Sequence, residues 1–194
     1  MDGNPAFTQK IATEKHPYYN VIREKFRHVP DWGVLMQPDE IVYLKHNIGN
    51  KTVFEHYLVS RSEESRINMT IAAILTENGY NNIKLLPQIH FSESELRKRY
   101  FGEKYVKTTG NPDAEINGVI VEFKSATQRN LARRISEASK KSDVIVIVSK
   151  DLLSEDFIER FIKGQFFAKD RTNISEIILI NEDNKVYKKL RRDY

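Results

Sequence analysis

One short run of β-branched residues constrains the fold of this chain more than any other segment. Residues 143–149 read Asp-Val-Ile-Val-Ile-Val-Ser, and helical patterns precede and follow them. Both faces of such a strand are apolar, which is typical of a strand buried in the middle of a sheet. We therefore expect a layered α/β domain in which helices flank a sheet.

Periodic segments on either side supply the other layers. Residues 39–46 and 51–59 are rich in β-branched and aromatic residues, and the turn between them predicts an early β-hairpin. Residues 81–89 predict a strand at a sheet edge, because Pro87 cannot donate a ladder hydrogen bond. The other expected elements are helices at 19–26, 62–78, 131–141 and 154–168, and a hairpin made of 176–181 and 185–190.

The order of these elements predicts the architecture. From residue 62 onward it is helix, strand, hairpin, helix, buried strand, helix and hairpin, which makes an α/β sandwich on a mixed sheet. Residues 1–60 form a predicted N-terminal accessory segment that holds the short helix and the early hairpin. Residues 61–194 form the predicted main domain.

Composition excludes several classes of protein. The chain has no Cys and five scattered His, so disulfides and Cys-type zinc or iron–sulfur sites are excluded. No apolar stretch approaches the roughly 20 residues that span a membrane, and the N-terminus lacks the pattern of a secretion signal. We therefore expect a cytoplasmic protein without membrane contact. The net charge of +4 is compatible with a polyanionic partner, but many proteins without one share it.

The chemistry concentrates between Asn111 and Lys124. Asp113 follows a proline, a turn pair comes next, and Glu122 and Lys124 then stand two residues apart in an apolar run. In a strand, such residues share one face. If the turn folds a hairpin, Asp113 lies on the neighbouring strand near Glu122. Two carboxylates and an ammonium then converge, an arrangement that suits a hard divalent cation and a phosphate. The alternative is a surface hairpin with a salt bridge worth at most about 1 kcal/mol.

A phosphodiesterase of this kind needs carboxylates for the metal, an activated water, and positive charge near the phosphate. Asp113 and Glu122 are the predicted ligands of Mg²⁺ or Mn²⁺. Lys124 is predicted to activate the water or to offset the negative charge that develops on the phosphate.

These residues resemble a known signature. Asn-Pro-Asp113, then eight residues, then Glu122-Phe-Lys124 resembles the PD-(D/E)XK nucleases. With Glu77-Asn-Gly-Tyr80 and Leu85-Leu-Pro87 before it, the segment from about residue 60 to 190 resembles the C-terminal nuclease domains of contact-dependent growth inhibition toxins and related phage and mobile-element proteins. The resemblance implies a restriction-endonuclease-like mixed sheet, and it assigns metal binding to the Asp and Glu and the handling of water to the Lys.

The same resemblance raises the question of a third acid. These families often place a Glu on the helix before the sheet, and Asn68 occupies that position here. Glu64 lies one helical turn earlier on the same face. We expect Glu64 to be the third catalytic and metal-binding carboxylate, with Glu63 and Asn68 as the alternatives.

Polar residues after the motif are candidates for substrate binding. A predicted strand-to-helix turn carries several of them, and its side chains and helix N-terminus can contact phosphate. A capping or turn role is the alternative. A basic face on the following helix is more often a solvated surface than a binding site. The expected substrate-binding residues are Gln128, Ser125, Thr127, Asn130, Arg129 and Lys107, and the basic face comprises Arg133, Arg134, Lys140 and Lys141.

The predicted function is a metal-dependent endonuclease that hydrolyses phosphodiester bonds. The resemblance favours RNA, and transfer RNA in particular, over DNA, and it implies a cognate immunity protein as partner. Many nucleases of this type pair to cut both strands, so a homodimer is one alternative for the oligomeric state. Metal-free RNA cleavage by His56 with Glu55, or by His90 with Glu93, is another mechanism. A catalytically degenerate module that binds nucleic acid, or a protein-interaction module that uses a strand edge, is the alternative function.

Overall fold

The computed structural model describes residues 10–12, 42–56, 63–106 and 110–194. Within these ranges, nine strands form one mixed sheet whose spatial order follows the chain. The strands are β1 (Lys10–Ala12), β2 (Val42–Ile48), β3 (Lys51–His56), β4 (Ile83–Leu85), β5 (Ala114–Ile116), β6 (Val119–Ala126), β7 (Val144–Ser149), β8 (Glu176–Ile180) and β9 (Val186–Leu190). The α-helices are α2 (Glu63–Glu77), α3 (Ser94–Phe101), α4 (Leu131–Ser139) and α5 (Glu155–Phe166). The predicted helix at 19–26 lies outside the described residues.

Strand β7 is the buried centre that its sequence predicts. It pairs in parallel with β6 and with β8. Val146 packs into one apolar cluster, whereas Ile145 and Ile147 pack into a second cluster on the opposite face. All three side chains are completely buried. The alternation of a strand thus places both faces of β7 in a core, which confirms the prediction.

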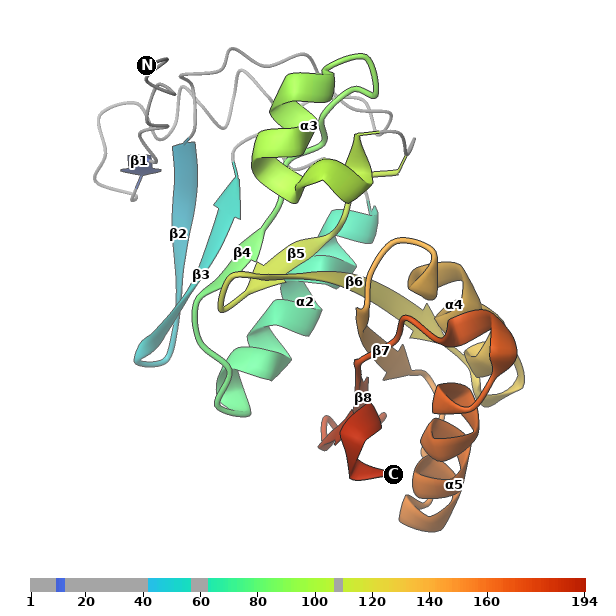
Figure 1. Cartoon of the computed structure of the whole chain (residues 1–194). Helices are drawn as coiled ribbons and strands as arrows, with labels where there is room; N and C mark the ends of the chain where they lie inside the picture. Colours follow the sequence, from blue (N-terminus) through green and yellow to red (C-terminus); the bar gives the residue numbers. More distant parts are fainter. Residues whose placement is uncertain (1–9, 13–41, 57–62, 107–109) are drawn as a thin grey trace.

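Helices cover the two faces of the sheet. Ile71, Ala72 and Leu75 of α2 join the cluster that contains Val146. Leucine, isoleucine and phenylalanine side chains of α4 and α5 build the cluster on the other face. Figure 1 shows α2 and the α4–α5 pair on opposite sides of β7 and β8. The mixed α/β sheet flanked by helices is therefore confirmed.

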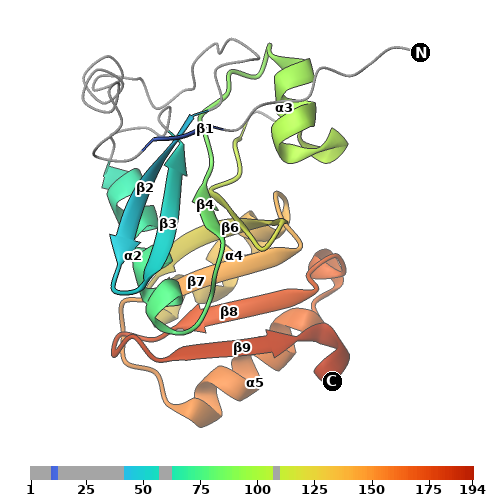
Figure 2. The ribbon, with the colours of Figure 1, turned by 90° about the vertical axis from the view of Figure 1, so that its left-hand side faces the viewer.

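The early hairpin is also confirmed, because β2 and β3 pair antiparallel with Ile48 opposite Lys51. Strand β3 then pairs in parallel with β4, so the hairpin continues the same sheet. In Figure 2, β2 and β3 run upright while β6 to β9 run across the view, which shows how strongly the sheet twists. The division of the chain near residue 60 stays a prediction.

The expected edge position of the strand at 81–89 is wrong. β4 is confined to Ile83–Leu85 and lies between β3 and β5. Pro87 follows the end of the strand, so its missing N–H removes no ladder bond from the centre of the sheet. Instead, the backbone N–H of Leu86 donates to the carbonyl of Asp113 at 3.0 Å, and this bond continues the contact with the β5 segment.

A tight turn sets the register of the next hairpin. Asn117 and Gly118 both have positive φ, at 50° and 83°, which suits a two-residue turn between twisted strands. Ile116 therefore pairs with Val119, and Ala114 pairs with Val121. This register fixes which residues face each other at the open end of the hairpin.

Within the described ranges, no helix has both the length and the apolar character needed to cross a membrane.

Candidate active site

Two carboxylates meet at the open end of the β5–β6 hairpin. Since Ala114 pairs with Val121, the next residues outward are Asp113 and Glu122. Glu122 is completely buried, and Asp113 is only 8% exposed. Burying two acids side by side is costly unless cations or donors compensate them. The contacts of each carboxylate therefore indicate what the site is built to hold.

Asp113 is fixed by two donors. Its Oδ2 accepts a hydrogen bond from the backbone N–H of Phe123 at 2.8 Å. Its Oδ1 accepts one from the side-chain amide of Asn68 on α2 at 3.0 Å. Burial, and after it the neighbouring charge of Glu122, raise the pKa of Asp113 to about 7 against the opposing effect of Lys124. Two hydrogen bonds thus fix the orientation of the carboxyl group, while its surroundings disfavour the negatively charged form.

Glu122 carries two lysines on one oxygen. Its Oε1 accepts from Lys124 Nζ at 2.6 Å and from Lys141 Nζ at 2.7 Å. Its Oε2 is buried and has no hydrogen-bond partner in the described structure. A buried carboxylate oxygen without a donor is rare in folded proteins and calls for an explanation.

The charge on Lys124 is stabilised in place. Burial alone would lower its pKa, but the negative charges of Glu122 and Asp113 outweigh that effect, and the net pKa is raised. The ammonium is therefore retained at neutral pH and compensates the two acids. This differs from the surface salt bridge that was the alternative interpretation, because the side chain of Glu122 has no exposed area.

The residues present fit a divalent cation held by two carboxylates. Mg²⁺ is usually bound through one or two carboxylates and several waters, and the free Oε2 of Glu122 beside Asp113 offers such ligands. Among the described residues, no group of three or more His, Cys, Asp and Glu side chains has an arrangement that could hold a metal. The hairpin therefore contributes two acids, and the geometry does not group Glu64 with them as a third.

Helix α2 places different residues at the site and at its border. Asn68 contacts Asp113 directly, as the alternative assignment of the third position allowed. Glu64 and Glu63 line a groove beside the site together with Lys124 and Ser125. The charge of Glu64 is close enough to contribute to the raised pKa of Lys124. Asn68 thus belongs to the carboxylate cluster, and Glu64 belongs to the adjoining groove.

The predicted substrate-binding residues separate in the structure. Ser125 lines the groove. Thr127 and Asn130 cap the turn before α4, where the backbone N–H of Thr127 donates to Asn130 Oδ1 at 2.9 Å. The backbone N–H of Gln128 donates to a carboxylate oxygen of Asp151. Gln128 and Arg129 are both exposed, and neither lines the groove. Lys107 lies outside the described residues.

Lys141 is the site residue that the sequence analysis missed. It was grouped with the exposed basic face of the helix at 131–141, but α4 ends at Ser139, and Lys141 follows in the loop before β7. Because β6 and β7 are parallel and Glu122 pairs with Ile145, this loop lies near the start of β6. One feature of the sequence could have indicated this role. Lys141 stands just before the apolar strand β7, and β7 lies parallel to β6, which carries Glu122 and Lys124.

A comparison with protein families finds a match over part of the chain. Residues 109–186 match a family model. The family is described as the contact-dependent growth inhibition CdiA C-terminal domain. The matched segment runs from just before Asp113 to the start of β9 and includes Glu122, Lys124 and Lys141. It agrees with the resemblance to growth inhibition toxins, whereas the PD-(D/E)XK assignment stays a prediction.

Two further comparisons complete this result. No curated protein sequence matches the chain. Among solved structures, the chain is similar to one titled "CdiA-CT/CdiI toxin and immunity complex from Burkholderia pseudomallei", with 20% sequence identity and a TM-score of 0.43. The alignment covers 68% of this chain and 90% of that one.

His56 and His90 each contact a side chain other than the acid considered with it for metal-free cleavage. Glu55 contacts His46 Nε2 at 2.6 Å, whereas His56 Nε2 contacts the hydroxyl of Tyr100 at 3.1 Å. Since adjacent residues of a strand point to opposite faces, a His56–Glu55 pair is wrong. The ring nitrogen Nδ1 of His90 contacts the hydroxyl and the backbone N–H of Ser92.

Burial of His56 predicts a loss of stability in acid. Burial lowers its pKa to about 3, from about 6.5 in the unfolded chain. Between these values the unfolded state binds the extra proton, so the stability present above pH 6.5 is lost as the pH falls. From pH 6.5 to 5.0 the free energy of unfolding should fall by about 2 kcal/mol from this group. Urea unfolding at several pH values measures it.

The variant His56→Gln provides the comparison for this prediction. Tyr43 and Tyr100 pack edge-on against the His56 ring, so the variant will also lose contacts at every pH. The informative quantity is the slope of the free energy of unfolding against pH below 6.5. An equal slope in wild type and variant would show that His56 does not cause the acid sensitivity.

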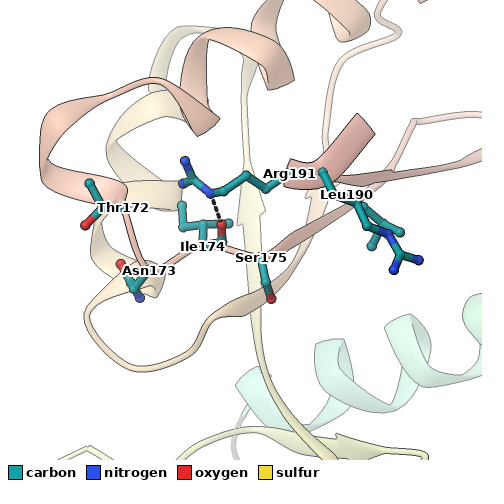
Figure 3. A pocket seen from close by; sticks show the side chains of 7 residues that line it. Thr172, Asn173, Ile174, Ser175, Leu190 and Arg191 are labelled. Atoms are coloured by element: carbon teal, nitrogen blue, oxygen red, sulfur yellow. Dashed lines mark hydrogen bonds between the residues drawn. The ribbon is translucent and has the colours of Figure 1, made fainter. Parts of the chain in front are cut away.

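A separate pocket lies between the segment before β8 and the end of β9. It is lined by 172–175 and 190–192 and contains none of the predicted site residues. Figure 3 shows Arg191 reaching over Ile174, whose carbonyl accepts from Nε at 2.6 Å. Arg191 also donates to the carbonyls of Arg171 and Phe166. Its guanidinium is occupied by backbone oxygens, so Arg191 serves to join these segments.

Proposed function

We propose that this protein is a metal-dependent endonuclease that hydrolyses phosphodiester bonds in nucleic acid. The observation that carries the proposal is the completely buried Glu122, with one oxygen shared by two lysines and the other without a donor, next to Asp113. The match of residues 109–186 to the CdiA C-terminal domain supports a toxin activity. The resemblance to toxin nucleases favours RNA, and transfer RNA in particular, as substrate.

The carboxylates have the role of ligands in this proposal. Asp113 and Glu122 would hold Mg²⁺ or Mn²⁺. Glu64 lines the adjoining groove rather than the carboxylate cluster, and it would act as a third acid only if its side chain turned toward the metal. A bound metal supplies a Lewis acid and lowers the pKa of a coordinated water. Asn68 and the backbone N–H of Phe123 orient Asp113, because their hydrogen bonds occupy one lone pair on each of its oxygens. Such outer contacts commonly tune a metal site.

The two lysines supply positive charge to the reacting phosphate. Both hold the same oxygen of Glu122, so either one can keep that contact while the other turns toward a phosphate oxygen. Charge that is already positioned costs little reorganisation when the negative charge of the transition state develops. Lys124 is partly exposed to the groove and is the proposed contact to the phosphate or the attacking water.

A cleavage assay tests the proposal. The protein of residues 1–194 is incubated with total transfer RNA, single-stranded DNA and plasmid DNA, each with Mg²⁺, Mn²⁺ or EDTA. Cutting of at least one substrate with metal and none in EDTA is the expected result, with transfer RNA cut most readily. Folded protein that cuts none of these substrates under any condition would overturn the proposed function.

Asn68 supports a second candidate, a degenerate module that binds nucleic acid without cutting it. An amide stands where related families often carry a Glu, and the described residues hold no cluster of three acids suited to a metal. This module would bind oligonucleotides in a salt-dependent manner and leave them intact. The same assay, combined with a binding measurement, separates the two candidates.

A cognate immunity protein is the proposed macromolecular partner. The similar solved structure is titled as a toxin and immunity complex. An inhibitor of this chain would block cleavage when it is added to the assay.

Lys141→Ala should lower the cleavage rate by about a hundredfold, because removal of one preorganised charge contact commonly has an effect of that size. Gly110→Ala should lower it in the same direction. A Cβ at Gly110 would lie 2.8 Å from Cε of Lys141, so the end of this lysine must shift, and the shift should disturb its contact with Glu122. Initial rates on the best substrate provide the measurement.

Lys140→Ala is the matched control for both substitutions, since Lys140 is the exposed neighbour of Lys141. The Gly110→Ala variant should keep its unfolding midpoint close to that of the wild type, because only the far end of a side chain has to shift. Rates of Lys141→Ala and Lys140→Ala that agree within twofold would contradict a role for Lys141.

A further inference from the structure

We infer that the groove beside the carboxylates binds the backbone of a polynucleotide, and that Arg134 and Lys150 hold a phosphate next to the one that is cut. The inference rests on the proposed function and adds to it. It assigns a substrate class, a chain that extends at least one phosphate beyond the scissile bond, and it assigns two binding residues outside the sequence motif.

The groove continues directly from the carboxylate cluster. Lys124 belongs to both, because it holds Glu122 and also lines the groove. Phe123 and Ser125 of β6 also line the groove, Arg134 reaches it from α4, and Lys150 follows the end of β7. A substrate whose phosphate lies at Lys124 therefore has a path along the groove toward Arg134 and Lys150.

The strand pairing sets the distance between the two phosphate positions. Lys124 and Ala126 are two residues apart on β6, about 7 Å along the strand. The backbone N–H of Lys150 donates to the carbonyl of Ala126 at 2.7 Å, so Lys150 stands about that far beyond Lys124. This separation is of the order of one nucleotide in an extended backbone. The two lysines are thus spaced for neighbouring phosphates.

Arg134 has donor capacity to spare. Its Nη1 donates to Glu137 Oε2 at 2.9 Å, while its Nε is buried and has no hydrogen-bond partner in the described structure. A guanidinium is suited to phosphate because its planar donors bind two oxygens at once. The preceding residue, Arg133, contacts the same Glu137 but does not line the groove, and its side chain is 59% exposed against 38% for Arg134.

The charges of the groove determine where the backbone lies. Glu63 and Glu64 line the α2 side, and the three cations Lys124, Arg134 and Lys150 line the other side. A phosphate chain is repelled by the acids and attracted by the cations, so it should follow the wall made by β6, α4 and the end of β7. The basic face predicted from the sequence therefore divides: Arg134 faces the groove, Lys141 holds Glu122, and Arg133 is exposed.

Binding without cleavage tests the inference. The protein of residues 1–194 in EDTA is titrated into a fluorescent single-stranded RNA of twelve nucleotides at several salt concentrations. Arg134→Ala and Lys150→Ala should each weaken binding several-fold and reduce the salt slope by about 0.7 to 1, the value for one lost phosphate contact. Arg133→Ala is the matched control, with the same charge change on the same helix, and it should bind as the wild type does.

Substrate length provides an independent measurement. In cleavage assays, Arg134→Ala and Lys150→Ala should raise KM more than they lower kcat, and the rise in KM should be larger for the twelve-nucleotide RNA than for a dinucleotide. Circular dichroism checks the folding of each variant. If Arg134→Ala fails to fold, Arg134→Gln is tested in its place, and Lys150→Gln at the exposed Lys150 is tested beside it.

The outcomes separate this inference from the proposed function. Binding and salt slopes of both variants that equal those of Arg133→Ala would overturn the inference, even if the protein cuts RNA. A second outcome is a protein that cuts no substrate but whose salt-dependent binding is weakened by Arg134→Ala and by Lys150→Ala. That outcome would overturn the proposed nuclease activity and support the binding of nucleic acid in the groove.

Discussion

Glu122→Gln should lower the rate of nucleic-acid cleavage by about a thousandfold. An amide of the same shape keeps the packing of this fully buried side chain, but it is a poor ligand for a divalent cation. A metal that acts as Lewis acid is worth several kcal/mol of transition-state stabilisation, which corresponds to about that loss in rate. Initial rates on the best substrate, together with Mn²⁺ binding measured by calorimetry, provide the test.

The control for this prediction is Glu115→Gln on the same hairpin. Glu115 is a half-buried acid on β5 that pairs with Lys84 at 3.0 Å, away from the carboxylate cluster. This variant should keep its activity and its Mn²⁺ binding. A Glu122→Gln protein that binds Mn²⁺ as tightly as wild type, or that cuts within tenfold of the wild-type rate, would contradict the role of Glu122 as a ligand.

Arg97→Met should lower the free energy of unfolding by about 4 kcal/mol or more. Arg97 is completely buried, and its donors bind the carbonyls of Ile89, Tyr105 and Gly110 and the side-chain oxygen of Asn111. Each buried acceptor left without a donor costs about 1–3 kcal/mol. The midpoint of urea unfolding should therefore fall steeply, and the slope of the transition reports whether unfolding stays cooperative.

The matched control is Lys98→Met on the same helix. Lys98 is exposed, and its ion pair with Glu103 is exposed as well, so the substitution should change the midpoint very little. Arg97→Met should also impair cleavage, because Asn111 stands two residues before Asp113. Equal unfolding midpoints for the two variants would show that Arg97 does not hold this segment.

The sequence predicted those parts of the fold that are determined by residues close together along the chain. The β-branched run gave β7, and the Asn117–Gly118 pair gave the turn that brings Asp113 opposite Glu122. Both depend on side-chain periodicity or backbone conformation over a few residues. The carboxylate pair was predictable because the hairpin that forms it is local.

Features that depend on distant segments were missed. The central place of β4 depends on its pairing with β3 and β5, which no feature of residues 81–89 specifies. The contact between Lys141 and Glu122 depends on the parallel pairing of β6 with β7. Asn130 has a polar side chain suited to substrate, yet the backbone N–H of Thr127 occupies its oxygen. In each case, tertiary pairing decides among several local interpretations.

The strand order has a consequence for how the chain folds. Within the described residues, each strand of the sheet pairs with the strand that precedes or follows it along the chain. Contacts between segments close in sequence lose little loop-closure entropy, and proteins rich in them fold faster than those with distant pairings. The antiparallel hairpins β2–β3, β5–β6 and β8–β9 can therefore form first, whereas the other pairs join strands that are separated by a helix or a long connection. During refolding, a chain of this topology should form its three hairpins early and its long-range strand pairs last.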